Sequence, residues 1–169
     1  MREPFDHHGN GTAMLAIKLA RACGLNESEV EMIGHAARLH DIGKILLRTE
    51  LLNAPRKLTE AERSEMQTHV TLGWAIVNEA RYSSSIQEVV RYHHERLDGS
   101  GYPDGLAGSQ IPQVAQLVSV CDVYFALTSP RPYREAFSHN FAKAMIQKDK
   151  GSRFDPELVD LFFDRVARG

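Results

Sequence analysis

Histidine and aspartate are the residues of this chain whose types and spacing could do chemistry. The chain has eight histidines in 169 residues, and the pairs His40-Asp41 and His93-His94 each place two potential metal ligands side by side. Imidazole and carboxylate groups are good ligands for first-row metal ions. Neighbouring side chains on a helix point about 100° apart. Each pair therefore suits two adjacent ions, or a bridging arrangement, better than chelation of a single ion.

Three isolated residues could join these pairs. His8 and His69 each lie at the start of an expected helix, and Asp122 lies inside the apolar stretch Val118-Ser119-Val120-Cys121-Asp122-Val123. A carboxylate in such surroundings is costly to bury unless it is paired or bound to a metal ion. Each of these residues alone would fit an ordinary structural role. We interpret His7, His35 and His139 as surface or partly buried histidines without a role in chemistry.

Convergence is the physical basis for a metal-site hypothesis. Helix bundles build metal sites from side chains on facing helices. One catalytic zinc ion takes three or four protein ligands, whereas two ions about 3.5–4 Å apart, bridged by a carboxylate, would use more. The sequence predicts a shared site formed by His8, His40, Asp41, His69, His93, His94 and Asp122.

Cationic side chains near the same segments indicate an anionic substrate. Lys44 lies three residues after Asp41, which places both on one face of a continuing helix. Arg131 and Arg134 follow the segment that carries Asp122. A guanidinium group can bind phosphate oxygens through two parallel hydrogen bonds. Beside a metal site, these three residues favour a phosphate-containing substrate.

Helix signals are frequent along the chain, whereas strand alternation is rare. Asn26 with Glu29, and Thr59 with Glu62, form predicted capping boxes, and Asp155-Pro156 is a typical helix start. The Gly/Pro-rich stretch at 98–112 predicts a long loop. We expect a compact all-α helical bundle with helices near 11–23, 26–40, 59–67, 69–80, 85–94, 114–127 and 155–165.

The composition is typical of one globular domain, which we place at residues 1–169. A net charge of -2 argues against non-specific binding of nucleic-acid polymers. Cys23 and Cys121 lack metal-binding spacing and are predicted to be small buried hydrophobes. No apolar run reaches the roughly 20 residues that span a bilayer, so we expect no membrane association and a cytoplasmic location.

The motifs together resemble those of the HD-GYP domains, a branch of the HD-domain metal-dependent phosphohydrolases. The resemblance covers nearly the whole chain and rests on His40-Asp41 with Gly43-Lys44, on His93-His94-Glu95, on Asp98-Gly99-Ser100-Gly101-Tyr102-Pro103, on Arg131-Pro132-Tyr133 and on Phe154-Asp155-Pro156. It implies an HD-type fold and hydrolysis of cyclic di-GMP to linear pGpG, with GMP as a further product.

The same resemblance implies roles for individual residues. The metal ligands of the family correspond to the seven residues of the predicted site, with Asp41 bridging, and iron or manganese is the usual metal, although other divalent ions are compatible. Lys44, Arg131 and Arg134 match positions that contact phosphates. The Gly101-Tyr102-Pro103 loop is associated with activity and with contacts to signalling proteins, and the residues leave open which role Tyr102 has.

Three departures from the family pattern affect these expectations. Pro4 occupies the position where members with a third metal have glutamate, so we expect two divalent ions. Phe125 replaces a frequent aspartate, which should alter support of the ligands rather than remove one. Gly9 and Gly11 should weaken the helix start around His8, which makes His8 the least secure predicted ligand.

Three hypotheses about function are therefore open. The first is a phosphodiesterase in which Asp41 and Lys44 take part in catalysis on cyclic di-GMP. The second is a signalling module with little turnover, which binds cyclic di-GMP or a protein partner. The altered residues around His8 and at Phe125 support this module, whereas retention of the other ligands argues against it. The third is an enzyme that acts on another cyclic dinucleotide, and no residue in the sequence decides between the substrates.

Overall fold

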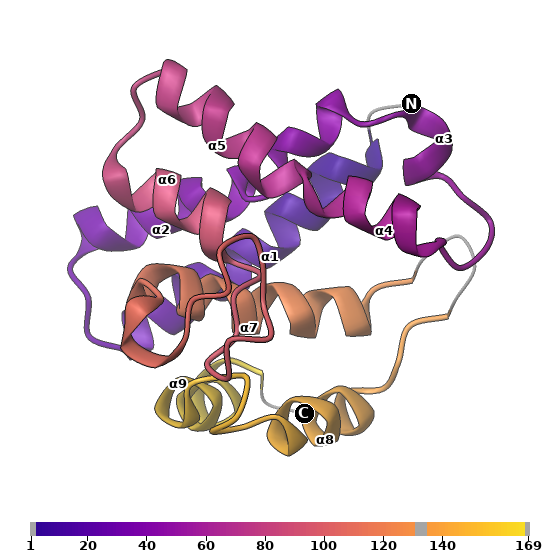
Figure 1. Ribbon diagram of the computed structural model, residues 1–169. Helices are drawn as coiled ribbons and strands as arrows, with labels where there is room; N and C mark the ends of the chain where they lie inside the picture. The colour runs from indigo at the N-terminus through magenta and orange to yellow at the C-terminus, as the bar shows by residue number, and fades with distance from the viewer. Residues whose placement is uncertain (1–2, 131–134, 168–169) are drawn as a thin grey trace.

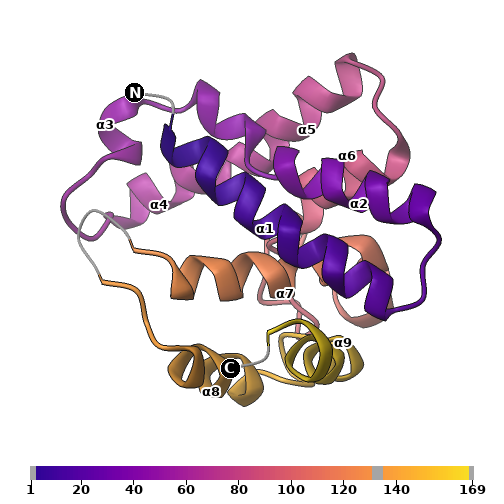
Figure 2. The same cartoon turned by 180° about the vertical axis from the view of Figure 1, so that it is seen from behind.

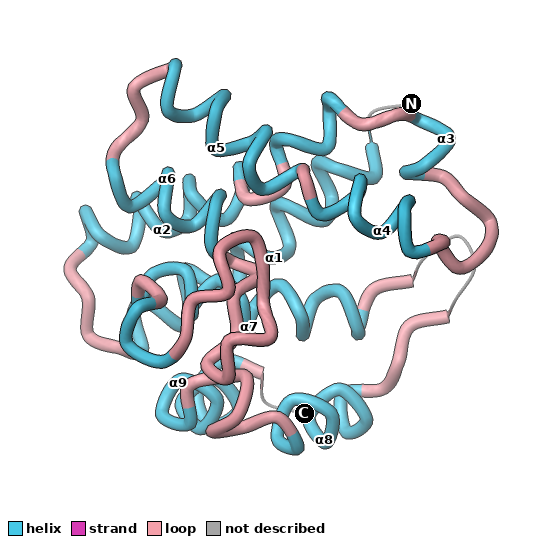
Figure 3. The backbone as a smooth tube through the Cα atoms, viewed as in Figure 1, coloured by secondary structure: helices cyan, strands magenta, loops and turns pink. Residues whose placement is uncertain are grey.

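A computed structural model describes the backbone of residues 3–130 and 135–167, with side chains described from His8 onward. The all-α architecture predicted from the sequence is confirmed: the described part of the chain has helices and only two isolated β-bridges (Figures 1 and 3). The longer helices are α1 (Glu3–Ala22), α2 (Glu27–Leu39), α4 (Glu60–Gln67), α5 (His69–Glu79), α6 (Ser84–Tyr92), α7 (Gln113–Thr128) and α8 (His139–Lys148). The shorter turns of helix are η1 (Ile42–Leu46), α3 (Thr49–Leu52), η2 (Gly108–Gln110), α9 (Pro156–Leu161) and η3 (Phe162–Val166).

Helix α1 is the centre of the packing. It lies against both α2 and α7, and α6 contacts α2, α5 and α7; Figure 2 shows α1 crossing the molecule between α2 and α7. Fully buried Leu19 on α1, Ile33 on α2 and Val118 on α7 belong to one hydrophobic cluster, which α9 and η3 extend through Phe162. This core fixes the helices whose ends carry the predicted site.

Local sequence signals set several helix starts. The side chains of Asn26 and Thr59 accept hydrogen bonds from the backbone N–H groups of Glu29 and Glu62. The side chain of each glutamate in turn accepts a hydrogen bond from the backbone N–H of its cap residue. Both predicted capping boxes are therefore confirmed. Asp155 caps α9 by accepting the N–H of Leu158. These bonds satisfy N–H groups that a helix start would otherwise leave unpaired.

The first helix differs from the expectation that it begins near residue 11, because α1 starts at Glu3 and continues through Gly9 and Gly11. The glycines serve close packing here. A Cβ atom on Gly11 would lie 2.0 Å from the Phe125 ring, and one on Gly9 would lie 2.9 Å from the carbonyl oxygen of Arg38. The absence of these side chains lets α1 approach α2 and α7 closely.

Two further elements differ from the predicted ranges. The helix expected at 26–40 ends at Leu39 and is followed by the separate turn η1, and the sequence did not predict α8. The predicted loop at 98–112 is confirmed except for the single turn η2. No helix in the described ranges has the length and apolar character needed to cross a bilayer.

Candidate metal centre

The predicted histidines and aspartates meet in one buried cluster. Its first group contains His8 from α1, His40 after α2 and Asp41, with ligand atoms within 4.8 Å of one another. Asp122 of α7 joins this group, because its Oδ1 lies 2.9 Å from His8 Nε2 and 3.6 Å from His40 Nε2. Residues more than 110 positions apart are therefore brought together by the packing of α1, α2 and α7.

The second group shares Asp41 with the first and adds His69, His93 and His94. His69 begins α5, and His93 and His94 follow the last residue of α6. Asp41 Oδ1 lies 3.2 Å from His69 Nε2 and 3.9 Å from His93 Nε2, whereas Asp41 Oδ2 lies 3.5 Å from His40 Nε2. The two oxygens of Asp41 thus face different groups.

Backbone carbonyls orient three of the imidazole rings. The Nδ1 atoms of His40, His69 and His93 lie 2.7, 2.8 and 3.0 Å from the carbonyl oxygens of residues 37, 66 and 89, each one helical turn earlier. A carbonyl accepts only, so Nδ1 carries the proton and Nε2 points into the cluster. A backbone acceptor on the remote nitrogen is the usual support of a metal-ligating histidine.

The unpaired nitrogen and oxygen atoms of the cluster fit a bound cation. His40 Nε2, His69 Nε2, His93 Nε2 and Asp41 Oδ1 are buried atoms that lack a hydrogen-bond partner among the described residues. Burying such atoms unpaired is unfavourable. In the neutral tautomer favoured by the backbone, each of these nitrogens would present a lone pair, and the carboxylate oxygen beside them is also an acceptor. Facing acceptors require positive charge between them, which a proton or a metal ion can supply.

Burial and neighbouring charges shift the pKa values of His40, His93 and His94 in opposite directions. Burial opposes a proton on His40, but the carboxylates of Asp41 and Asp122 outweigh burial and raise its pKa to about 9. Burial lowers the pKa of His94 to about 3 and that of His93 well below its usual range. His93 and His94 are therefore neutral near pH 7, the state in which imidazole binds a metal ion.

Both aspartates are ionised despite their burial. Burial alone would raise the pKa of Asp41, but the charges of His40 and Lys44 hold it well below the usual value. Burial would also raise the pKa of Asp122, but the nearby imidazole of His40 and the hydrogen bond with His8 hold it well below the usual value. A buried pair of carboxylates stabilised by cations is the electrostatic setting that attracts a divalent ion.

The predicted cationic residues divide by position. Lys44, on η1, is half-buried, and its Nζ donates a hydrogen bond to Asp41 Oδ2. A Cβ on Gly43 would lie 2.0 Å from the carbonyl oxygen of His69, so this glycine lets η1 pack directly on α5. Arg131 and Arg134 lie outside the described residues.

His8 is firmly placed in the cluster. Its ring lies 5.6 Å from the ring of Phe125, which fills the space left by Gly11. Its Nε2 bonds Asp122. Gly11 and Phe125, which belong to two separate departures from the family pattern, therefore fit each other in space. Of the histidines interpreted as ordinary, His35 is exposed and His139 lies 3.0 Å from the Tyr124 hydroxyl; the side chain of His7 lies outside the described part.

Two residues beside the cluster were not identified from the sequence. Glu95 is 3% exposed, and its carboxylate accepts backbone N–H groups from residues 104, 105 and 106. Arg96 donates to the carbonyls of His93 and Glu95 and to the hydroxyl of Ser119. Their positions within His93-His94-Glu95-Arg96 were the only available signal, since the bonds they form depend on the folded loop.

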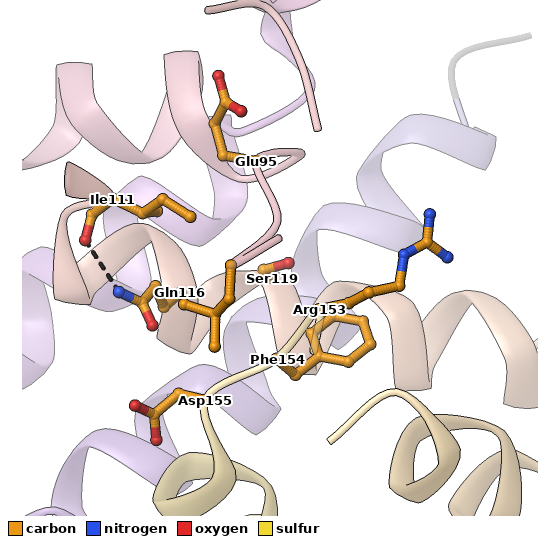
Figure 4. A pocket seen from close by; sticks show the side chains of 8 residues that line it. Glu95, Ile111, Gln116, Ser119, Arg153, Phe154 and Asp155 are labelled. Atoms are coloured by element: carbon orange, nitrogen blue, oxygen red, sulfur yellow. Dashed lines mark hydrogen bonds between the residues drawn. The ribbon is translucent and has the colours of Figure 1, made fainter. Parts of the chain in front are cut away.

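A small cavity lies on the other side of this segment (Figure 4). Its lining includes Ser119, Gln116 and Phe154 but none of the clustered histidines or aspartates, and Gln116 donates a hydrogen bond to the carbonyl of Ile111 across it. The carboxylate of Glu95 points away from Gln116 and Phe154 in this view. The cavity is therefore separate from the candidate metal centre.

Comparison with known sequences places this site in a family. The HD domain family matches residues 2–158. The cyclic di-GMP phosphodiesterase response regulator RpfG of Xanthomonas campestris is 44% identical over 84% of this chain and 38% of its own length. The 3'3'-cGAMP-specific phosphodiesterase 2 of Vibrio cholerae is 36% identical over 93% of this chain and 30% of its own. The chain thus spans about a third of these relatives.

Solved structures show the same fold. The HDG"Y"P protein Bd1817 from Bdellovibrio bacteriovorus has a TM-score of 0.79 at 20% identity, over 95% of this chain and 51% of its own. The HD domain of the L. monocytogenes phosphodiesterase PgpH, in complex with cyclic-di-AMP, has a TM-score of 0.67 at 15% identity, over 96% and 88%. The resemblance to HD-GYP domains is confirmed by these matches, and the chain belongs to the HD-domain family.

Proposed function

We propose that this chain is a metal-dependent phosphodiesterase that hydrolyses cyclic di-GMP to linear pGpG, with GMP as a further product. The observation that carries the proposal is the convergence of three buried imidazole nitrogens and the carboxylate oxygen Asp41 Oδ1, which lack hydrogen-bond partners among the described residues. Relatives named as cyclic di-GMP and cGAMP phosphodiesterases support a cyclic dinucleotide as the substrate. Because the chain spans a minor part of those relatives, the experiment below uses this chain itself.

Two divalent ions, iron or manganese, would be held by the two groups. Asp41 supports this number because its two oxygens face different sets of histidines. The ligands we propose are His8, His40, Asp41, His69, His93, His94 and Asp122. When bound, such ions lower the pKa of water and stabilise the charge that develops on a phosphoryl group.

Asp41 and Lys44 are the residues we assign to the reaction itself. Asp41 orients both groups through its shared carboxylate, and its low pKa keeps it ionised throughout. The Lys44 ammonium lies beside Asp41 Oδ2, at the edge of the cluster. From there it can bind a non-bridging phosphate oxygen and donate a proton to the leaving oxygen. Arg131 and Arg134 stay predictions as further phosphate-binding residues.

The direct test is turnover by metal-loaded protein. We expect linear pGpG from cyclic di-GMP after loading with Mn²⁺, and loss of product for Asp41→Asn. Asp160→Asn is the matched control, because Asp160 pairs with Lys150 away from the cluster. Full activity of a metal-loaded Asp41→Asn protein would contradict the assignment of Asp41.

Two alternatives are separated by the same assay. Binding of cyclic di-GMP without product would favour a signalling module, whose support from the altered residues near His8 is weakened by the fit between Gly11 and Phe125. Faster turnover of 3'3'-cGAMP or cyclic di-AMP would favour another cyclic dinucleotide, as in the cGAMP-specific relatives. A protein partner at the Gly101-Tyr102-Pro103 loop stays a prediction.

A further inference from the structure

His94 is held differently from the other histidines of its group. His69 and His93 each have Nδ1 fixed by a carbonyl of the preceding helical turn. The ring of His94 forms no hydrogen bond with the described residues, although it lies within the same group of candidate ligands. A ligand without such a bond can rotate about its side-chain torsions, and its orientation must come from packing.

An aromatic stack supplies that packing. The ring of Tyr102 lies 4.8 Å from the ring of His94, with an angle of 29° between the planes. The ring of His93 also contacts His94, with 4.1 Å between the ring centroids and an angle of 44° between the planes. Offset stacked rings attract each other beyond the effect of the apolar area that they bury. Tyr102 therefore restricts the rotation of His94.

The loop that carries Tyr102 is itself anchored beside the histidines. Glu95 accepts three backbone N–H groups from residues 104–106, at 2.8, 3.1 and 3.0 Å. The Tyr102 N–H donates to the carbonyl of His94. A Cβ on Gly101 would lie 2.4 Å from Glu95 Cα and 2.6 Å from the carbonyl oxygen of His94, so the loop packs directly on the backbone of residues 94–96. Arg91 of α6 adds a salt bridge to Asp104.

We propose that Tyr102 is a positioning residue, whose ring fixes the imidazole of His94 toward the second metal group, and that Glu95 holds the loop which places it. The inference rests on the proposed metal site and assigns the Gly101-Tyr102-Pro103 loop a role inside that site. The ring, rather than the hydroxyl, carries the effect.

The test compares three proteins by Mn²⁺ binding to metal-stripped chain, with thermal unfolding as a check on folding. We expect Tyr102→Phe to keep the parent's dissociation constants within about twofold, because the stacked ring is retained. Tyr102→Leu should weaken one of the two Mn²⁺ sites about tenfold, the lower range for residues that orient ligands. The other site, formed around His8 and His40, should be unchanged.

A double-mutant cycle shows whether Tyr102 acts through His94. In a His94→Ala background, Tyr102→Leu should cause no further loss of Mn²⁺ affinity, since coupled residues do not add. Glu95→Gln should weaken the same site as Tyr102→Leu, whereas Glu79→Gln, an exposed control at the end of α5, should have no effect. Additive losses in the cycle would overturn the inference.

Two other results would also overturn it. Equal Mn²⁺ affinities of parent and Tyr102→Leu would show that the stack does not orient His94, and an equal loss in Tyr102→Phe would assign the effect to the hydroxyl. The proposed function can be refuted independently of the positioning role of Tyr102. A parent that binds Mn²⁺ and shows the expected cycle, but does not cleave cyclic di-GMP, would support the positioning role and refute the activity.

Discussion

The two groups of candidate ligands that share Asp41 are supported in different ways. His8, His40 and Asp122 come from α1, α2 and α7, which pack around the main hydrophobic core. His93 and His94 instead follow the end of α6, beside a loop whose backbone N–H groups donate hydrogen bonds to the Glu95 carboxylate. His8 and Asp122 reach the first group only through long-range helix packing, whereas His93 and His94 are neighbours in sequence and lie beside a loop held by hydrogen bonds.

This difference indicates which structural change would displace the side chains of each group. A change in helix packing should displace the first group while the second keeps its backbone-oriented rings. A change in the loop should do the opposite. Only Asp41 belongs to both groups, so only its loss should affect both at once. This separation can be tested with variants whose effects differ in size.

The largest effect is expected for Asp41→Asn. The amide has no charge to stabilise cations and cannot serve as an ionised bridge, so both Mn²⁺ sites should weaken by at least about a hundredfold, with a matching loss of turnover. Calorimetric titration of metal-stripped protein measures both sites. A variant that lost one site and kept the other would contradict the shared role of Asp41.

A selective effect on the first group is expected for Gly11→Ala. The added Cβ would lie 2.0–2.6 Å from atoms of the Phe125 ring, and the overlap should cost about 1–3 kcal/mol of unfolding free energy. The gain in helix propensity of about 1 kcal/mol offsets only part of it. Denaturant unfolding and Mn²⁺ titration should show lower stability and a weakened His8 site.

The double variant Gly11→Ala with Phe125→Leu is the matched control. The smaller side chain makes room for the methyl group, so stability and the His8 site should both recover in part. Loss of the His94 site in Gly11→Ala, with the His8 site intact, would show that the two groups are not supported separately.

These structural details differ in how far the sequence could predict them. The capping boxes at Asn26 and Thr59 depend on residues three positions apart, so the sequence contains all of the information they need. The convergence of the histidines and aspartates was also predicted, because their types and the helical pattern left few other uses for buried ionisable groups. What each residue ligates stays a prediction.

Other features depend on contacts that the sequence does not display. Gly9 and Gly11 indicated a weak helix start, whereas in the fold they let α1 approach its neighbours. Helix α8 was missed because Phe141 and Met145 are exposed on it and only Ala142 and Ile146 are buried, so its apolar pattern does not mark one buried face. The three bonds of Glu95 require the folded loop.

A smaller effect is expected for the release of protons when a metal ion binds. The pKa of His40 is raised to about 9 in the metal-free protein, so this histidine is protonated at pH 7.5. A metal ion needs its neutral form, and binding should therefore release about one proton from His40. His93 and His94 should release none, because burial has already lowered their pKa values.

The sign of the pH dependence follows from the raised pKa. Mn²⁺ affinity of the His40 group should rise with pH up to about 9, by about tenfold per unit, and level off above it. Calorimetry at pH 7.5 in buffers of different ionisation enthalpy counts the released protons. Zero proton release would show that His40 is already neutral in the metal-free protein. The carboxylates of Asp41 and Asp122 would then not outweigh the effect of burial on its pKa.

The smallest effect is expected for His35→Gln, which separates histidines inside the cluster from those outside it. His35 lies on α2 five residues before His40, so the two residues point to different sides of the helix axis, and His35 is exposed. An exposed substitution of this kind should change the unfolding free energy by less than about 0.5 kcal/mol. Mn²⁺ affinity and turnover should match the parent, whereas His40→Gln should weaken the first group. A loss of metal in His35→Gln would mean that histidine content, rather than position in the cluster, governs binding.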